Sequence, residues 1–232
     1  MGFYSPVIRE HVASIQHFAT GRMLDVGCGD KPYYDQFQNV TNYIGIDIPA
    51  SIDIARANSK RRVTAVDVYS VGQCLPFINE SFDSVATFQV IAHLPDPFQF
   101  IGEISRVLKK DGILIITYPM VSPFSEAPQD YFRYTEYGML QLCNTFHLEI
   151  IEQQRMGGGW QTIGFLIRHL LLKNHENTNS SFLKKIYAML AIRLYNFCCF
   201  LDKKNDHSDI PLNYLTVARK TYKKNLVTLN QH

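Results

Sequence analysis

Residues 22–30 read RMLDVGCGD, and this stretch indicates the fold of the chain more clearly than any other. A short apolar run that includes one acid, Asp25, breaks into Gly27-Cys28-Gly29. This pattern is typical of a buried parallel strand that ends in a loop. Gly27 and Gly29 have no side chain to block a ligand, and both tolerate a positive φ. We therefore expect a strand followed by a loop whose backbone contacts another molecule.

A second acid indicates what that loop holds. Eighteen residues after Gly29, the apolar run 43–46 ends in Asp47. At the end of the second strand of a βαβ unit, an acid binds the ribose hydroxyls of a nucleoside that lies over the first loop. Pro32 replaces the third glycine of a dinucleotide fingerprint, and no glycine-rich run is followed by the Lys-Ser or Lys-Thr pair of a P-loop. The two motifs favour an S-adenosylmethionine (SAM) site, and a simple tight turn between strand and helix is the alternative.

Composition excludes some classes of partner. Of the 232 residues, 46% are hydrophobic, and 23 basic against 21 acidic residues leave a net charge of +2. A nucleic-acid-binding surface needs a clear basic excess, so we expect no nucleic-acid partner. The five cysteines are odd in number and lie in apolar runs, which predicts reduced thiols and a cytoplasmic protein. They show no metal-ligand spacing, so a reaction without a metal is expected. We expect neither a signal peptide nor a membrane-spanning helix.

Alternating extended and helical patterns predict an α/β fold with a doubly wound, mostly parallel Rossmann-like sheet. Ligands of such sheets lie over the carboxyl ends of the strands. Asp111-Gly112 is expected to turn the chain into the fifth strand. Strands are expected at residues 22–27, 43–47, 62–67, 82–88, 113–118, 148–153 and 214–219. Helices are expected near residues 5–18, 33–37, 51–58, 97–109 and 135–143.

About sixty residues between the last two expected strands lie outside this pattern. Gly157-Gly158-Gly159 is expected to be a flexible hinge, and residues 160–172 and 182–201 are expected to form strongly apolar helices. We interpret the helices as an amphipathic cap over the site, a homodimer interface, or both, with a membrane-surface helix as the alternative. We expect a single domain with an N-terminal helix, a core, a helical insertion, a last strand and a tail at residues 1–20, 21–156, 157–210, 211–220 and 221–232.

Several motifs together resemble those of class I SAM-dependent methyltransferases, and they occur in the order found in that family. They are LDVGCG at 24–29, YIGIDI at 43–48, LPFINESFDSV at 75–85, HLPDP at 93–97 and RVLKKDGILIITYP at 106–119. The resemblance covers residues 21–151. It implies a seven-stranded sheet whose last strand is antiparallel, and it implies SAM as the cofactor, with S-adenosylhomocysteine as its product.

The resemblance also implies roles for single residues. Asp25 and the glycine loop would line the methionine side of the cofactor, Asp47 would accept the ribose hydroxyls, and Asp67 would accept the adenine amine. For Asp67, a structural loop cap is the alternative. The expected cofactor-binding residues are Asp25, Gly27, Cys28, Gly29, Asp47, Ile48, Asp67, Val68 and Gln89.

A narrower resemblance concerns the methyl acceptor. APQDYFRYTEYG at 127–138 and GDKPYY at 29–34 are similar to segments of methyltransferase-11-type enzymes of bacterial polysaccharide and sugar-derivative biosynthesis. This similarity implies a sugar, nucleotide-sugar or glycan acceptor. An Asp130–Arg133 pair that only fixes the loop is the alternative to a substrate-binding arginine. The expected substrate-binding residues are Tyr33, Tyr131, Arg133 and Tyr134.

A hydroxyl acceptor must lose its proton, so a general base is expected. His93, at the exit of the fourth strand, is the first candidate because histidine titrates near neutral pH, and Asp130 and Tyr131 are the alternatives. Relatives often carry a glutamate in place of Ala92, and a histidine where Ser125-Glu126 stands here. Another base, another acceptor and an inactive protein therefore stay open.

Two rival functions follow from the same residues. One is a methyltransferase that acts on a small-molecule or lipid acceptor, with the apolar helices as a lid. The other is a non-catalytic SAM-binding subunit that acts on a partner through its helical insertion. Methylation of a base nitrogen is disfavoured, because Thr87-Phe88-Gln89-Val90 lacks the Asn/Asp-Pro-Pro-aromatic platform that holds a planar amine.

Overall fold

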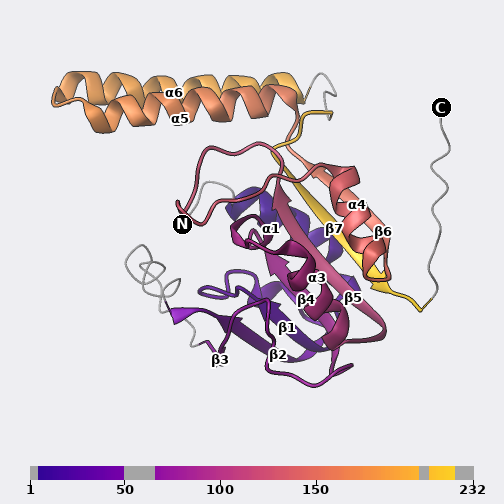
Figure 1. Ribbon diagram of the computed structural model, residues 1–232. Helices are drawn as coiled ribbons and strands as arrows, with labels where there is room; N and C mark the ends of the chain where they lie inside the picture. Colours follow the sequence, from indigo (N-terminus) through magenta and orange to yellow (C-terminus); the bar gives the residue numbers. More distant parts are fainter. Residues whose placement is uncertain (1–4, 50–65, 204–208, 223–232) are drawn as a thin grey trace.

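The computed structural model describes residues 5–49, 66–203 and 209–222, and a seven-stranded sheet forms its centre (Figure 1). The strand order is β3-β2-β1-β4-β5-β7-β6. All pairings are parallel except those of β7, which is antiparallel to both β5 and β6. The predicted doubly wound, mostly parallel sheet with an antiparallel last strand is therefore confirmed.

The strands follow the apolar runs of the sequence. Within β5, the residues from Ile113 to Pro119 are all buried, as expected for a strand that helices cover on both faces. The expected fourth strand has the observed bounds. The strands are β1 (Gly21–Val26), β2 (Val40–Asp47), β3 (Val68–Tyr69), β4 (Phe82–Phe88), β5 (Leu108–Pro119), β6 (Leu148–Met156) and β7 (Asn213–Lys220).

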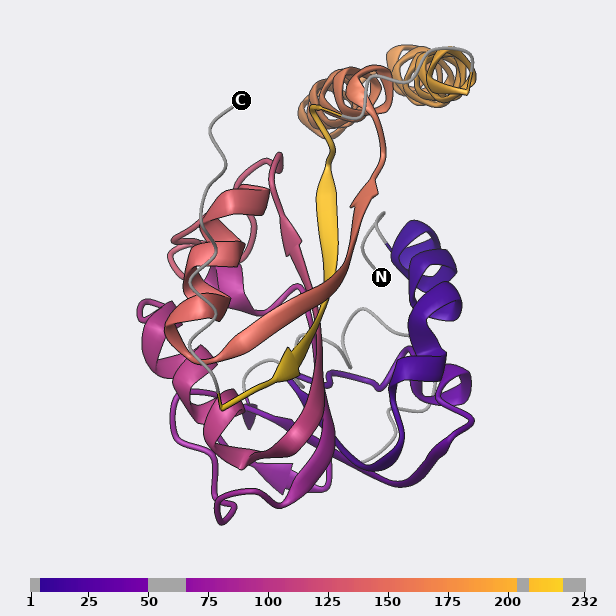
Figure 2. The same ribbon diagram turned by 90° about the vertical axis from the view of Figure 1, so that its right-hand side faces the viewer.

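Helices cover the two faces of the sheet, with α3 and α4 on one face and α1 on the other (Figure 2). Local signals start two of them: Asp96 accepts a hydrogen bond from the Gln99 amide at the start of α3, and Thr135 caps α4. The helices are α1 (Ser5–Ile15), α3 (Pro97–Val107), α4 (Glu136–Thr145), α5 (Gly159–Asn177) and α6 (Ser181–Asp202). Short 3₁₀ turns are η1 (Gln16–Phe18), η2 (Tyr34–Gln36) and η3 (Ile91–His93).

Two local predictions are wrong. Residues 33–37 form only the turn η2, because so short a segment offers too few i→i−4 hydrogen bonds to nucleate a helix. Asp111-Gly112 does not precede the fifth strand but lies inside β5. Asp111 has φ +60°, and the pairing with β4 shifts register between Phe82 and Ser84, so this dipeptide forms a bulge in a longer strand.

The third predicted strand is only partly described. The expected helix 51–58 and residues 62–65 of the expected strand lie outside the described residues. The described strand, β3, begins at Val68, directly after Asp67.

The glycine triplet 157–159, expected to be a flexible hinge, leads into a capped helix, and its flexibility stays a prediction. Gly159 is the first residue of α5. The carboxylate of Asp202, at the end of α6, accepts hydrogen bonds from the amides of Gly158, Trp160 and Gln161 at 3.1, 3.0 and 2.8 Å. These bonds fasten the two ends of the helical insertion to each other.

Candidate functional site

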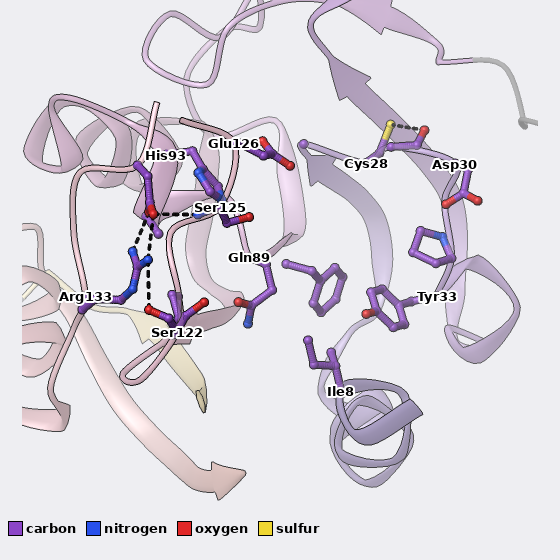
Figure 3. Close-up of a pocket in the computed structure, with 17 residues that line it drawn as sticks. Ile8, Cys28, Asp30, Tyr33, Gln89, His93, Ser122, Ser125, Glu126 and Arg133 are labelled. Atoms are coloured by element: carbon purple, nitrogen blue, oxygen red, sulfur yellow. Dashed lines mark hydrogen bonds and ion pairs between the residues drawn. The ribbon is translucent and has the colours of Figure 1, made fainter. Parts of the chain in front are cut away.

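A cavity of about 330 Å³ lies at the carboxyl ends of β1, β4 and β5 (Figure 3). Its walls come from α1, the loop after β1, the turn after β4 and the loop after β5. None of the described residues of α5 or α6 lines it, so the described structure does not support a cap formed by these helices. The lining residues are Ile8, Gly27, Cys28, Gly29, Asp30, Pro32, Tyr33, Phe88, Gln89, Ala92, His93, Pro119, Ser122, Ser125, Glu126, Asp130 and Arg133.

The glycine loop uses its two glycines differently. Gly27 and Gly29 both have positive φ, +77° and +52°. A Cβ on Gly27 would come within 2.2 Å of the Cγ2 atom of Val90, so this glycine allows close packing. A Cβ on Gly29 would meet no described atom within 4 Å. The backbone of Gly29 is therefore open to a ligand in the cavity.

Asp47 holds the glycine loop from the end of β2. Its carboxylate is nearly buried and accepts hydrogen bonds from the amides of Gly29 and Ile48, both at 2.7 Å. A carboxylate offers about four acceptor positions, so two bonds leave capacity for a pair of hydroxyl donors. This residue fits the ribose of a nucleoside that lies over Gly29.

Asp25 lies in β1 beneath the loop, where its carboxylate is buried. One oxygen accepts a hydrogen bond from the Tyr43 hydroxyl, and the other has no partner among the described residues. Burial raises the pKa of Asp25 to about 7, although the Tyr43 bond opposes the shift. A buried oxygen without a partner beside the glycine loop fits a polar group of the cofactor.

Asp67 and Val68 lie at the β2–β3 edge and do not line the cavity. One oxygen of Asp67 accepts hydrogen bonds from the Gly45 amide at 2.7 Å and from the Lys31 ammonium at 2.6 Å. Burial raises the pKa of Asp67, but these two donors outweigh it and hold the pKa below its usual range. The adenine-binding role of Asp67 and Val68 and the cofactor-binding role of Ile48 stay predictions.

His93 faces the cavity from η3, and its hydrogen bond defines its tautomer (Figure 3). The Nδ1 atom lies 2.7 Å from the carbonyl oxygen of Gln129. Because a carbonyl only accepts, Nδ1 carries the proton in the neutral ring, and Nε2 is left as the acceptor. A histidine held this way is arranged to take up a proton at Nε2.

Gln89 lies on the same wall in a strained conformation, with φ +62°. Its amide donates to the carbonyl of Thr117 at 3.1 Å, and its side-chain nitrogen lies 3.2 Å from the Thr117 hydroxyl. These bonds to the adjacent strand β5 fix a non-glycine residue at positive φ on the cavity wall.

Asp130 and Arg133 line the cavity as a tight pair. Two guanidinium nitrogens donate to the two carboxylate oxygens at 2.6 and 2.8 Å, and the Ser125 amide donates to Asp130 at 2.9 Å. The Arg133 guanidinium, helped by the Ser125 amide, lowers the pKa of Asp130 to about 2. Arg133 also donates to the Pro123 carbonyl at 3.1 Å. This geometry favours a pair that fixes the loop, and a carboxylate of such low pKa is a weak base.

The predicted substrate-binding tyrosines are not brought together. Tyr33 lines the cavity with its ring packed against Phe88, 4.5 Å between centroids. Tyr131 and Tyr134 lie outside the lining. Tyr131 is half-exposed, and its amide donates to the Ala92 carbonyl at 2.9 Å. Burial raises the pKa of Tyr134, whose ring packs against Tyr118.

Several lining residues were not predicted from the sequence. Ile8 reaches the cavity because Arg9 donates to the Pro32 carbonyl at 2.6 Å and holds α1 against the loop after β1. No local pattern marks a contact between segments so far apart. Ser122, Ser125 and Glu126 precede the segment 127–138 that drew attention, and only their position after an apolar strand indicates them.

Other chemistry is limited within the part of the chain that the structure describes. No group of three His, Cys, Asp or Glu side chains in these ranges is arranged to hold a metal ion. All five cysteines are free thiols. Among the described helices, none combines the length and the apolar character that crossing a bilayer requires.

Comparisons with known proteins agree with this site. Residues 24–116 match the family model described as a methyltransferase domain. A probable SAM-dependent methyltransferase of Mycolicibacterium smegmatis is 31% identical over 134 residues, which cover 55% of this chain and 51% of that protein. A ubiquinone biosynthesis O-methyltransferase of Xanthomonas oryzae is 30% identical over 117 residues, which cover 49% of each. The chain thus spans about half the length of these curated relatives.

Solved structures with low sequence identity share the fold. A putative methyltransferase of Bacillus halodurans matches with a TM-score of 0.57 at 19% identity. The matched region covers 91% of this chain and 99% of that protein. A [4+2]-cyclase has a TM-score of 0.59 at 22% identity, with 92% and 79% covered. A Haemonchus contortus phosphoethanolamine N-methyltransferase 2 in complex with SAM has a TM-score of 0.54 at 18% identity, with 91% and 52% covered.

The sheet order, the glycine loop and the strand-end acid define the Rossmann-like methyltransferase fold. The match to the methyltransferase-domain model over residues 24–116 includes the glycine loop, Asp47 and His93.

Proposed function

We propose that this protein binds SAM over the glycine loop and transfers its methyl group to a hydroxyl of a sugar, nucleotide-sugar or glycan intermediate. The methyltransferase domain supports the cofactor, and the relative named as an O-methyltransferase supports an oxygen acceptor. The observation that carries the proposal is His93, which lines the same cavity as Gly29 and whose Nδ1 is held by the Gln129 carbonyl, so that Nε2 is the acceptor of the neutral ring.

The residues that would hold the cofactor are those at the strand ends. Asp47 would accept the two ribose hydroxyls, and the open backbone of Gly29 would lie against the nucleoside. When bound, SAM supplies a methyl group on a positively charged sulfur. Alignment of the acceptor with that methyl group, in a site that excludes water, can contribute about 7–11 kcal/mol to the lowering of the barrier.

His93 would act on the acceptor. Nε2 would take up the hydroxyl proton of the acceptor while Nδ1 stays bonded to the Gln129 carbonyl. The methyl group that the acceptor oxygen gains would part from sulfur, the bonding electrons would stay on sulfur, and S-adenosylhomocysteine would be the second product. The resulting imidazolium is stabilised by the Asp130 carboxylate, which interacts electrostatically with His93. Asp130 thereby assists as a fixed negative charge and not as the base.

The lining beyond His93 is polar and suits an acceptor with several hydroxyl groups. Ser122, Ser125 and Glu126 face the cavity from the loop after β5. Hydroxyl and carboxylate groups are ordinary hydrogen-bond partners of sugars. Arg133 holds this loop in place through Asp130 and the Pro123 carbonyl.

The first test is calorimetric titration with SAM and S-adenosylhomocysteine. We expect micromolar binding that Asp47→Ala abolishes and that Glu149→Gln, a control at an exposed acid on β6, leaves unchanged. Failure of the wild-type protein to bind either nucleoside would remove the methyltransferase proposal. The fold alone does not fix the reaction, since one of the similar structures is a cyclase.

The second test is transfer of labelled methyl groups to a panel of acceptors. We expect turnover with nucleotide-sugars or glycan fragments and loss of turnover in His93→Gln. Turnover only with phenolic small molecules or a lipid extract would replace the saccharide acceptor by the rival one. Tight cofactor binding without turnover on any acceptor would favour the non-catalytic subunit.

A further inference from the structure

The helices α5 and α6 form a hairpin, residues 159–202, that stands apart from the rest of the protein (Figure 1). The hairpin follows the carboxyl end of β6 and leads back to β7. It therefore lies at the same end of the strands as the cavity (Figures 1 and 2). The two helices pack on each other where Gly164 meets Cys198 and where Gln161 donates to the Tyr195 hydroxyl at 2.7 Å. At the base of the hairpin, the Thr162 hydroxyl donates to the carbonyl of Ile210, which precedes β7, at 2.8 Å.

The hairpin exposes many large apolar side chains. Leu170 is 62% exposed, Phe182 71% and Phe197 56%. More than half of the exposed large apolar side chains within the described residues belong to this hairpin. They are Trp160, Ile163, Leu166, Ile167, Leu170, Phe182, Leu183, Met189, Leu190, Ile192, Leu194, Phe197 and Phe200.

These side chains are arranged in rows, as their spacing shows. On α5, residues 160, 163, 167 and 170 follow each other at intervals of three and four, which places them on one helix face. On α6, residues 183, 190, 194 and 197 follow at intervals of seven, four and three and share one face, whereas the buried Ala191 and Cys198 lie on another face, where Cys198 meets Gly164 of α5. Each helix therefore has an apolar face besides the one that packs against its partner helix. Such faces normally mark a binding surface.

Charge is also segregated onto the hairpin. Residues 159–202 contain five basic residues (Arg168, Lys173, Lys184, Lys185 and Arg193) and two acidic residues, Glu176 and the helix-capping Asp202. The rest of the chain contains 18 basic and 19 acidic residues. The hairpin is therefore net +3, and the remainder is net −1. Two copies placed hairpin against hairpin would bring like charges together, which disfavours a second copy as the partner.

We propose that the hairpin docks this protein on the surface of an anionic phospholipid bilayer. The apolar rows lie at the boundary between headgroups and acyl chains, and the basic side chains pair with lipid phosphates. Helices with aromatic and aliphatic side chains on one face and lysine or arginine at its border bind membranes in this way. The cavity, at the same edge of the sheet, is then held close to the membrane surface.

The test is co-sedimentation of the full chain with vesicles, which requires neither cofactor nor acceptor. We expect binding to phosphatidylglycerol–phosphatidylcholine vesicles that is at least about tenfold tighter than to pure phosphatidylcholine, because each basic residue near an anionic surface strengthens binding about fivefold. Lys184→Glu with Lys185→Glu, and separately Leu190→Ser with Phe197→Ser, should each lower the affinity for anionic vesicles by more than about tenfold.

Matched controls separate docking from folding. Ile78 is an exposed apolar residue before β4, and Lys110 is an exposed basic residue near the start of β5. Both lie at the amino ends of the strands, away from the hairpin. The variants Ile78→Ser and Lys110→Glu should therefore bind vesicles as the wild type does. Unchanged thermal unfolding and S-adenosylhomocysteine binding will show that the hairpin variants are folded. Equal binding to neutral and anionic vesicles, no binding to either, or a stable dimer in sedimentation that the Leu190→Ser, Phe197→Ser variant dissociates would each overturn the proposal.

Discussion

Replacing the two loop glycines by alanine should separate folding from ligand binding. In Gly27→Ala, the added methyl group would come 2.2 Å from Val90 Cγ2 in a residue with φ +77°. In Gly29→Ala, the residue has φ +52° but no described atom lies within 4 Å of the new methyl group. The first variant therefore adds a clash to backbone strain, and the second adds strain alone.

The two costs can be set against each other. An alanine in the left-handed region costs about 1–2 kcal/mol, and overpacking costs about 1–3 kcal/mol more. We expect the free energy of unfolding to fall by about 1–2 kcal/mol in Gly29→Ala and by about 2–5 kcal/mol in Gly27→Ala. In Gly29→Ala the overpacking arises only when the ligand is bound, so its affinity for S-adenosylhomocysteine should fall about 10- to 100-fold.

Thermal unfolding and calorimetric titration of the two variants, side by side, provide the measurement. For a chain of this length, 1 kcal/mol corresponds to about 2–4 °C in the midpoint of unfolding. If Gly29→Ala binds S-adenosylhomocysteine as tightly as the wild type, no ligand occupies the space beside Gly29. If Gly29→Ala unfolds as early as Gly27→Ala, the space beside Gly29 is not open, and the reasoning fails in its first step.

Three further outcomes follow from the site. His93→Gln should lower kcat about 10²- to 10⁴-fold and leave S-adenosylhomocysteine affinity unchanged, as steady-state methyl transfer and calorimetry will show; unchanged kcat would exclude His93 as the base. The pKa of Asp25 is raised to about 7 in the folded protein, so its contribution to stability is present below pH 4 and is lost as the pH rises through 7. Between pH 5 and 8, the free energy of unfolding should therefore fall less in Asp25→Asn than in the wild type, as thermal unfolding at each pH will show. If the two proteins have the same pH dependence, the pKa of Asp25 is not raised. The pKa of Asp130 is lowered to about 2, so its contribution is present above pH 4 and is lost as the pH falls towards 2. Asp130→Asn should lower the free energy of unfolding by about 1–3 kcal/mol at pH 7, as denaturant titrations will show. This difference from the wild type should shrink below pH 4, and a difference that does not change with pH would contradict the ion pair.

Local patterns predicted the strands and the strand-end residues because each depends on a few neighbours in sequence. Residues 82–88 begin and end in phenylalanine and are bounded by the polar residues Ser81 and Gln89, and the observed β4 has the same bounds. Gly27, Cys28, Gly29 and Gln89 share the cavity because the carboxyl ends of neighbouring parallel strands meet at one edge.

Features that depend on distant contacts were not predicted. Ile8 lines the cavity through the bond of Arg9 to Pro32, which no periodicity reveals. Lys31 pairs with Asp67 across 36 positions, and the sequence alone assigned that acid only to adenine or to a loop cap. Tyr131 and Tyr134 appear equivalent in the motif, yet one is half-exposed and the other packs on Tyr118, because the loop bonds to the Ala92 and Pro119 carbonyls.

The position of β7 between β5 and β6 has a consequence for synthesis of the chain on the ribosome. β6 pairs only with β7, and β7 is the last of the described strands in chain order. While translation proceeds through α5 and α6, β6 has no strand to join and β5 has an open edge. The strands that carry the glycine loop and His93 are by then complete, so the nascent chain can form its cavity before its sheet is closed. A chain stalled before residue 213 should present two open strand edges together with an apolar hairpin, which makes this interval the one most exposed to aggregation.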